Sequence, residues 1–370
     1  MKVGIIIGDT GSVRSGMHNY IYHLLENLKK KQDLDLTLIV HDKQTIFPDL
    51  PYITPRYPFS GFSSFFWSQF LTLQTKIFNR FDLIHNPAHY PLIIKPSDRY
   101  VCTIHDLTPI LYPQYHPRWR TIYSRIAIPR LIRCSDKIIA DSLQTKRDLI
   151  SCYHITEDKI SVIYLGASKE YKKMDDQTVD AIRRKYNLNN PFILFIGNLE
   201  PRKNIPNLIR AFSRCRKQNA DLKLVIAGKK GWMFKEIFDT ITELNLEKSV
   251  IYLDYVPHED LPGLYNAAMI FVFVPFYEGF GLPVLEAMQC GTAVITSNTS
   301  SLPEIVGEKG IMVDPLDVVE LAEKMTLFIS DEHLRQENIR YNLSQCQQFS
   351  WEKCAQQTAE VYEEVCSKQV

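Results

Sequence analysis

The fold is decided by residues 192–215, FILFIGNLEPRKNIPNLIRAFSRC, and by a similar stretch at residues 3–28, VGIIIGDTGSVRSGMHNYIYHLLENL. Each stretch begins with an apolar run that predicts a strand, continues through a glycine and a polar loop, and ends with apolar residues at helical spacing. The apolar stripes of the two helices are Met17, Tyr20, Ile21, Leu24, Leu25 and Leu28, and Ile205, Leu208, Ile209, Phe212 and Cys215. We therefore expect the same type of domain to begin twice.

Short β-branched runs alternate with helical segments after each of these starts. The runs span residues 36–40, 100–104, 137–140 and 160–164, and then residues 222–227, 250–253, 270–274 and 293–296. This alternation is typical of βαβ units with parallel sheets. It predicts an α/β protein with two doubly wound, Rossmann-like domains at residues 1–170 and 171–349, joined by a polar connection at residues 166–190. Open sheets of this kind bind ligands at the carboxyl ends of their strands, so two domains facing one another would form a cleft.

Length and composition agree with two soluble domains. The chain has 370 residues, of which 45% are hydrophobic and 23% charged, and this excludes disordered and collagen-like classes. The net charge of +1 gives no reason to expect nucleic-acid binding. The charges are divided unevenly, because residues 1–170 hold 21 Lys and Arg against 15 Asp and Glu, which leaves 22 against 27 for the rest. A basic half is typical of contact with an anionic partner.

Several features favour a cytoplasmic protein. The eight cysteines show no C-x-x-C pair, which favours reduced thiols. The first apolar run ends at Asp9, too early for a signal peptide. The longest apolar stretch, residues 267–277, contains Pro275 and is shorter than the ~20 residues that span a membrane.

Residues 274–296, VPFYEGFGLPVLEAMQCGTAVIT, predict a strand end, two glycines and a helix that begins near Leu282. Glycines allow a ligand to approach the backbone, and a helix start offers unpaired N–H groups. Glu278 and Glu286 flank this helix start, and carboxylates of this kind can bind the hydroxyl groups of a ribose or another sugar. A helix N-terminus with an acidic first turn and a purely structural role is the alternative.

Residues 197–204, GNLEPRKN, predict a second site. Arg202 and Lys203 come between a strand and a helix, where two adjacent cations and the helix N–H groups can bind a diphosphate. Taken alone, such a pair is more often a solvated surface pair. The presence of Glu278 and Glu286 in the same domain favours the binding site.

These segments resemble the retaining glycosyltransferases of family four, also called group 1, which have the GT-B fold; the resemblance covers nearly the whole chain. EGFGLPVLEAMQCGT (278–292) resembles the family's E-x7-E motif, and GNLEPRKNIPNLIRAF (197–212) resembles the strand, loop and helix that hold the donor diphosphate. FSWEKCAQQTAEVY (349–362) is similar to the terminal helix, here expected at residues 350–366, that crosses back onto the first domain. GDTGSVRSGMHNY (8–20) resembles the glycine-rich loop under the donor without its usual Gly-Gly pair, and TIHDLTPILYP (103–113) resembles a strand end whose histidine lies close to the transferred sugar.

The resemblance implies roles for individual residues. Arg202 and Lys203 would bind the pyrophosphate and stabilise the leaving nucleoside diphosphate, Glu286 would bind the ribose, and Glu278 and His105 would contact the transferred sugar. Further donor-binding residues would be Gly11, Gly16, Asn198, Tyr255, Val256, Gly279, Phe280, Gly281 and Leu282. Many relatives have an arginine where this chain has Asn198, which leaves Arg202 as its substitute. His105 could instead cap a helix or turn, and His18, His85 and His89 are weaker candidates, expected in loops.

The function implied is transfer of a hexose from a nucleotide-diphosphate sugar to a glycan or lipid-linked saccharide, with retention, in cell-surface polysaccharide or lipopolysaccharide synthesis. GDP-mannose is the preferred donor, and UDP- and dTDP-sugars are alternatives. No enzymatic nucleophile is evident, which motivates a front-face mechanism. No metal or other cofactor is expected, because the one Asp-x-Asp, residues 33–35, leads into a strand of the first domain. A nucleotide-sugar epimerase and a non-catalytic nucleotide-sugar-binding subunit are the competing functions.

Two segments of the basic half could contact an anionic membrane at the cytoplasmic face. Residues 50–81 contain no acid and carry Phe62, Phe66, Phe70, Leu73 and Ile77 at helical spacing. A core helix of the first domain is the alternative for this segment. In the second segment five arginines are interleaved with apolar residues, namely Arg118, Arg120, Arg125, Arg130 and Arg133 with Trp119, Ile122, Tyr123 and Ile126. These patterns predict peripheral contact with anionic lipid or with a lipid-diphosphate acceptor.

Overall fold

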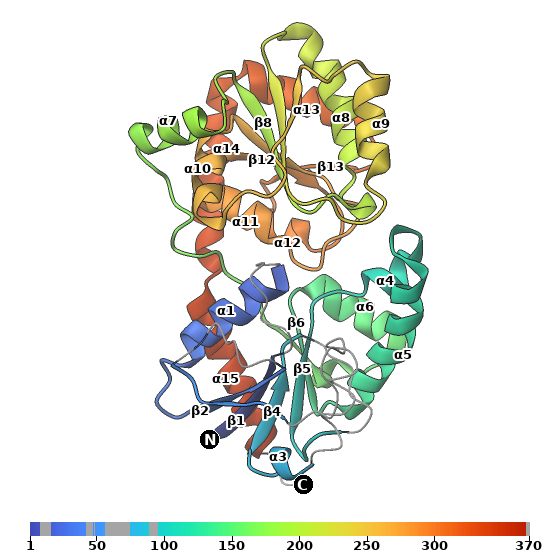
Figure 1. Cartoon of the computed structure of the whole chain (residues 1–370), viewed down its shortest axis with the longest axis vertical. Coiled ribbons are helices and arrows are strands. Elements are labelled where there is room, and N and C mark those ends of the chain that lie inside the picture. The colour runs from blue at the N-terminus through green and yellow to red at the C-terminus, as the bar shows by residue number, and fades with distance from the viewer. Residues whose placement is uncertain (8–15, 42–46, 48, 56–74, 89–94, 368–370) are drawn as a thin grey trace. The chain divides into compact units, whose positions relative to one another are not determined.

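The computed structural model describes residues 1–7, 16–41, 47, 49–55, 75–88 and 95–367. The chain divides into two compact units (Figure 1). Unit 1 contains residues 1–113, 117–166 and 350–370, and unit 2 contains residues 114–116 and 167–349. Each unit is built around a parallel sheet with helices on its faces, so the predicted α/β class with two Rossmann-like domains is confirmed.

In the described part of unit 1 the sheet has seven parallel strands in the order β3-β2-β1-β4-β5-β6-β7. Val3 of the first strand, β1, pairs with Leu36 of β2 on one side and with Leu83 of β4 on the other. The strands are β1 (Lys2–Ile7), β2 (Asp35–Val40), β3 (Tyr52–Ile53), β4 (Leu83–Asn86), β5 (Tyr100–Ile104), β6 (Lys137–Ala140) and β7 (Ile160–Val162). The helices of this unit are α1 (Gly16–Leu28), α3 (Thr75–Phe78), α4 (Thr108–Leu111), α5 (Arg118–Cys134), α6 (Leu143–Tyr153) and α15 (Trp351–Ser367).

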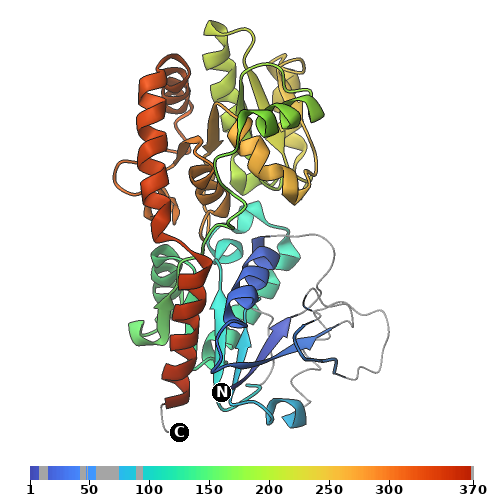
Figure 2. The same ribbon diagram turned by 90° about the vertical axis from the view of Figure 1, so that its left-hand side faces the viewer.

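The predicted apolar stripe of α1 is buried, except that Met17 is only partly covered, and one apolar face of α15 is buried as well. The two helices pack against each other, as Figure 2 shows for α1 (blue) and α15 (red). Tyr362 of α15 is bonded to His85 of β4, with 2.6 Å between the phenolic oxygen and Nδ1. The last helix of the chain is therefore part of the core of unit 1.

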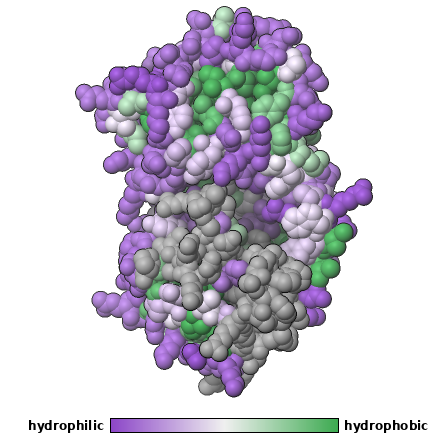
Figure 3. Space-filling view, in the orientation of Figure 1, coloured by the Kyte–Doolittle hydropathy of each residue, from purple (hydrophilic) through white to green (hydrophobic). Residues whose placement is uncertain are grey.

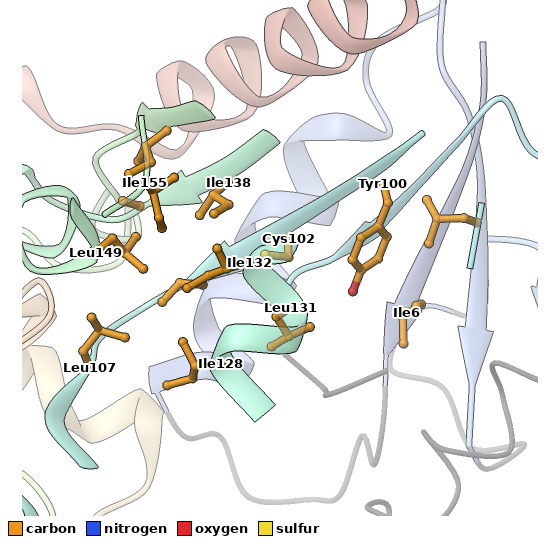
Figure 4. Close-up of a cluster of buried hydrophobic side chains, with 14 of the residues drawn as sticks. Ile6, Tyr100, Cys102, Leu107, Ile128, Leu131, Ile132, Ile138, Leu149 and Ile155 are labelled. Carbon is orange, nitrogen blue, oxygen red and sulfur yellow. The ribbon is translucent and has the colours of Figure 1, made fainter. Parts of the chain in front are cut away.

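The helices α5 and α6 cover the face of this sheet opposite to α1 and α15. Their buried side chains meet the strands in an apolar cluster that includes Ile6, Tyr100, Cys102, Leu131 and Leu149 (Figure 4). Such packing removes apolar surface from water and is the main source of stability in a domain of this kind. The cluster fixes one face of α5 inside the unit.

In unit 2 the sheet of the described residues has six parallel strands in the order β10-β9-β8-β11-β12-β13, the arrangement of a doubly wound Rossmann fold. The strands are β8 (Phe192–Ile196), β9 (Lys223–Ala227), β10 (Val250–Tyr252), β11 (Ile270–Phe273), β12 (Ala293–Ser297) and β13 (Ile311–Val313). The helices are α7 (Asp176–Lys185), α8 (Ile205–Cys215), α9 (Lys235–Glu243), α10 (Leu261–Ala267), α11 (Leu282–Gln289), α12 (Leu302–Val306), α13 (Val318–Ser330) and α14 (Glu332–Gln345).

The connection expected at residues 166–190 contains α7, which the sequence analysis did not predict. The carboxylate of Asp175 caps this helix by accepting the N–H of Thr178 at 2.9 Å. Ile182 of α7 packs so closely on Gly263 of α10 that a methyl group at position 263 would lie 2.5 Å from its side chain. None of the residues of α7 is fully buried, which agrees with its polar sequence.

Candidate functional site

Three predicted site residues of unit 2 meet in one buried cluster. The Oε1 atom of Glu278 accepts a hydrogen bond from Lys203 Nζ at 2.6 Å and another from the guanidinium of Arg202. Arg202 also donates to the carbonyl of Tyr277 at 3.1 Å, and its Nε lies 3.5 Å from a carboxylate oxygen of Glu200. Two cations and two carboxylates therefore lie together where the strands β8 and β11 end.

The backbone after β8 explains why Arg202 and Lys203 point to this place. A short 3-10 turn, η3 (Pro201–Lys203), ends at Asn204, which adopts a left-handed conformation with φ of 58°. The side-chain amide of Asn204 donates to the carbonyls of Val274 at 3.0 Å and Pro315 at 2.7 Å. The bond to Val274 fixes the turn to the loop that follows β11 and carries Glu278, and the bond to Pro315 fixes it to the segment that follows β13.

The glutamate loop is held in the same way from its other side. The N–H of Glu278 donates to Ser300 Oγ at 3.0 Å, and the hydroxyl of Ser301 donates to the carbonyls of Glu278 and Phe280. Gly281 has φ of 117°, and a methyl group there would lie 2.5 Å from the Leu302 side chain. The motif thus needs glycine at this position for both backbone and packing reasons.

The charge balance of the cluster keeps Glu278 ionised. Burial acts to raise the pKa of Glu278, but the charges of Arg202 and Lys203 outweigh it and hold the pKa below its ordinary value. The Lys203 ammonium also lies 4.8 Å from the centre of the Phe273 ring, a cation–π contact. A dianionic ligand that entered here would compete with Glu278 for both cations.

The second glutamate of the motif has a different environment. Glu286 lies inside α11 and is buried, and its Oε2 accepts a hydrogen bond from the Tyr265 hydroxyl at 2.9 Å. Burial raises the pKa of Glu286 to about 7. Arg202 and Lys203, which lower the pKa of Glu278, are not among the groups that counteract this rise. Glu278 and Glu286 therefore differ in protonation as well as in partners.

The remaining predicted residues of unit 2 lie along the carboxyl edge of the sheet. Asn198 follows β8 and is exposed; Tyr255 follows β10 and is exposed, with Lys229 Nζ 4.7 Å from its ring centre. Val256 and Gly279 are buried. Phe280 packs edge-on against Phe349, and Leu282 begins α11.

His105 of unit 1 follows β5, and both of its ring nitrogens have protein partners. Nδ1 lies 2.6 Å from Asp141 Oδ2, and Nε2 lies 2.9 Å from the carbonyl of Pro87. Burial acts to lower the pKa of His105, but the Asp141 carboxylate outweighs it and raises the pKa above the ordinary value. Since both partners accept, the ring donates from both nitrogens and is an imidazolium cation.

The other predicted residues of unit 1 lie in α1 and β4 or outside the described residues. His18 lies in α1, and His85 lies buried in β4 between Tyr362 and Thr103, so the expectation that both lie in loops was wrong. Gly16 is the first residue of α1. Gly11 and His89 lie outside the described residues, as do Phe62, Phe66, Phe70 and Leu73.

Three residues beside the predicted ones were not expected from the sequence. Glu200 lies beside Arg202, and Tyr265 and Tyr171 lie beside Glu286. Glu200 lies two residues before Arg202, and this proximity was the available signal. The tyrosines come from other elements, and nothing local in the sequence marks them. Among the described residues, no group of three or more His, Cys, Asp or Glu side chains is arranged to hold a metal ion. Asp35 is the first residue of β2.

Two family descriptions match consecutive parts of the chain. "Glycosyltransferase Family 4" matches residues 14–171, and "Glycosyl transferases group 1" matches residues 178–345. O-antigen chain mannosyltransferase B of Escherichia coli is 34% identical over 282 residues, which are 76% of this chain and 74% of that protein. Serotype-specific mannosyltransferase WbdA of Escherichia coli is 33% identical over 263 residues, 69% of this chain but only 32% of WbdA.

A solved structure has the same fold over the whole chain. Alr3699/HepE of Anabaena, crystallised in complex with UDP and glucose, superposes with a TM-score of 0.78 over 98% of this chain and 99% of its own, at 21% identity. Together with the mannosyltransferase B match, these findings confirm the resemblance inferred from the Glu278 and Arg202 motifs. The chain belongs to the glycosyl transferases group 1, glycosyltransferase family 4, and is a glycosyltransferase of GT-B fold.

Proposed function

We propose that the protein is a retaining mannosyltransferase that moves mannose from GDP-mannose to a glycan or lipid-linked saccharide in O-antigen or related polysaccharide synthesis. The proposal is supported by the 34% identity to an O-antigen chain mannosyltransferase over three quarters of each chain. The structural observation that carries it is the convergence of Lys203 and Arg202 on one oxygen of Glu278.

In this proposal the donor diphosphate replaces Glu278 as the partner of the two cations. Arg202 and Lys203 bind the phosphate oxygens, and Glu278, released from the ion pair, accepts hydrogen bonds from hydroxyls of the transferred sugar. Glu286 accepts hydrogen bonds from the ribose. The other donor contacts come from Gly11, Gly16, Asn198, Tyr255, Val256, Gly279, Phe280, Gly281 and Leu282. The donor diphosphate thus binds to two cations that the ion pair with Glu278 already holds in position.

The chemical step is a front-face displacement. The acceptor oxygen bonds to the anomeric carbon as the bond from that carbon to the phosphate oxygen breaks, and the hydroxyl proton passes to the leaving phosphate oxygen. Negative charge grows on the diphosphate in the transition state, so fixed cations at Arg202 and Lys203 stabilise that state more than the ground state. His105, as a cation, would lie on the side of the transferred sugar.

The two side-chain cations supply the positive charge that a divalent metal would otherwise bring to the diphosphate. We therefore propose metal-independent transfer, and full activity in excess EDTA is the expected result. Loss of activity in EDTA that Mg²⁺ or Mn²⁺ restores would contradict this part of the proposal.

Product analysis tests the whole proposal. The purified chain is incubated with GDP-mannose, UDP-glucose or dTDP-glucose and a lipid-linked saccharide acceptor, and the linkage is read by NMR. Release of GDP with an α-mannosyl product is expected, and Glu278→Gln should lose transfer. Turnover only with a UDP- or dTDP-sugar would reject the donor. Formation of a 2-epimer without acceptor, or binding without turnover, would reject transfer itself.

We further propose that the protein works at the cytoplasmic face of a membrane and that α5 is the contact. One face of α5 enters the core, whereas Trp119, Ile122 and Ile126 are 70%, 60% and 52% exposed. Figure 3 shows hydrophobic surface at the right-hand edge of unit 1, where Figure 1 places α5. No helix of the described residues is long and apolar enough to cross a membrane.

Charge favours anionic lipid as the partner of this face. The helix has no acidic residue, and the exposed arginines flank the apolar side chains at positions Arg118, Arg125, Arg130 and Arg133. Basic residues near an anionic bilayer contribute roughly 1 kcal/mol each, and the apolar side chains can enter the interface.

Vesicle flotation tests the membrane contact. The wild type should float with vesicles that contain phosphatidylglycerol and remain in solution with pure phosphatidylcholine. Trp119→Ala together with Ile122→Ser should reduce binding about tenfold or more, whereas Tyr52→Ser, which alters a side chain 45% exposed in the same unit, should not. No binding to anionic vesicles at low salt would reject the contact.

A further inference from the structure

Two buried tyrosines lie beside Glu286. The hydroxyl of Tyr265 of α10 donates to Oε2 of Glu286 at 2.9 Å, and the hydroxyls of Tyr265 and Tyr171 both act to lower the pKa of Glu286. The two rings pack edge to face with their centres 5.9 Å apart. Burial raises the pKa of both tyrosines, so both hydroxyls keep their protons and can donate.

Tyr171 comes from the segment with which the chain enters unit 2 after residue 166. Asn266 of α10 fastens this segment, because its amide nitrogen donates to the carbonyl of Lys172 at 2.9 Å and its amide oxygen accepts the N–H of Met174 at 2.9 Å. The ring of Tyr171 is fully buried against that of Tyr265. A residue of the entering segment is therefore packed onto the glutamate of α11.

His258 extends the contact toward the surface. It lies in the 3-10 turn η5 (His258–Asp260), and its Nδ1 is 3.3 Å from the Tyr171 hydroxyl. Its Nε2 is 2.7 Å from Glu170 Oε1, which is an acceptor, so Nε2 carries a proton. The contact with Nδ1 of His258 holds the Tyr171 hydroxyl in place beside Glu286.

We propose that Tyr171 and Tyr265 are positioning residues for Glu286, and that His258, held by Glu170, orients the hydroxyl of Tyr171. The proposal rests on the proposed role of Glu286 in binding the ribose of the donor. A carboxylate binds two ribose hydroxyls as an acceptor, and a protonated carboxyl cannot accept from both in the same way. The tyrosines favour the ionised form and fix the direction of its oxygens.

The surroundings of Glu286 explain why these donors matter. The titratable groups that face Glu286 or lie beside it come from the entering segment, η5, α10 and the end of α11, and are Glu170, Tyr171, His258, Tyr265 and Cys290. Only His258 can supply positive charge among them, whereas Glu278 has two cations. Burial raises the pKa of Glu286 to about 7, and each hydroxyl donor acts against that rise.

Calorimetric titration of GDP between pH 5.5 and 8.5 tests the proposal. Tyr171→Phe and Tyr265→Phe should each weaken GDP binding about tenfold at pH 7, the effect of losing one hydrogen bond to a charged group. The midpoint of the pH dependence should move upward, and affinity should recover at pH 8.5 as Glu286 ionises. Binding of 2′,3′-dideoxy-GDP should change little in either variant, because it lacks the hydroxyls that Glu286 would bind.

Controls separate this inference from the role of Glu286 itself. Tyr341→Phe removes another hydroxyl of unit 2, which accepts the N–H of Lys309, and should leave the GDP profile unchanged. His258→Gln should move the midpoint in the same direction as Tyr171→Phe. If Glu286→Gln binds GDP normally, the ribose role fails. If Glu286→Gln weakens binding but the Tyr171 and Tyr265 variants keep the wild-type profile, or lose affinity equally at every pH, the positioning role fails.

Discussion

Replacing Glu286 by Gln should stabilise unit 2 at neutral and alkaline pH, although it removes a residue of the proposed donor site. The native protein buries this carboxyl with a pKa of about 7, whereas its ordinary value is 4.5. The folded protein therefore holds the proton more tightly than the unfolded chain does. Stability from this group is present below pH 4.5 and is lost as the pH rises through about 7.

The size of the effect follows from the two pKa values. A shift from 4.5 to about 7 corresponds to about 3 kcal/mol of stability that the wild type loses between pH 4.5 and pH 8. Gln cannot ionise, yet it keeps the shape of the side chain and an oxygen that accepts from Tyr265. The Gln variant should match the wild type near pH 4.5 and exceed it by about 3 kcal/mol at pH 8.

Hydrogen exchange of peptides that cover β8 and β11 measures the unfolding of unit 2 at each pH. Glu278→Gln is the matched control, because that carboxylate neutralises Arg202 and Lys203, and its removal should destabilise the unit at pH 7. The reasoning is refuted if the stability difference between Glu286→Gln and the wild type stays constant from pH 5 to pH 8.

Three further predictions concern other parts of the molecule. His85 is buried with its pKa lowered to about 3, so the stability that it contributes is present above pH 6.5 and is lost as the pH falls toward 3. The loss can reach about 5 kcal/mol. Urea unfolding between pH 7 and pH 4 should therefore show a steeper loss of stability in the wild type than in His85→Gln. Gly228→Ala should destabilise unit 2 by several kcal/mol, since the added methyl would lie 2.0 Å from the Gly197 carbonyl oxygen, whereas a methyl at Gly16 meets no atom of the described residues within 4 Å and should leave the melting temperature unchanged. His105→Ala should retain folding and GDP binding but lose transfer, and normal transfer rates would reject the role of His105 at the sugar.

The sheets could be predicted from the sequence because strands of a parallel sheet are buried on both faces and read as continuous apolar runs. The predicted runs 100–104 and 137–140 coincide with β5 and β6. β4 was not predicted, because half of it is His85 and Asn86. These polar side chains are buried only because Tyr362, Thr103 and Tyr100 bond to them from other elements.

The candidate site was predictable only in part for the same physical reason. Arg202 and Lys203 were expected near Glu278, because loops that follow neighbouring parallel strands meet at one edge of the sheet. The environment of each charge could not be read from the sequence. Asp141, which turns His105 into a cation, and Tyr265, which bonds to Glu286, come from distant segments whose local sequence shows no sign of the contact. The roles of these residues in the reaction stay predictions.

Calorimetric titration of GDP and of guanosine into the wild type and into Lys203→Ala tests the proposed donor site. If Lys203 and Arg202 receive the diphosphate, GDP should bind the wild type at least tenfold more tightly than guanosine does, and Lys203→Ala should weaken GDP binding by about a hundredfold while guanosine binding stays the same. Equal affinity of Lys203→Ala and wild type for GDP would contradict the assignment of the site and of the mechanism built on it.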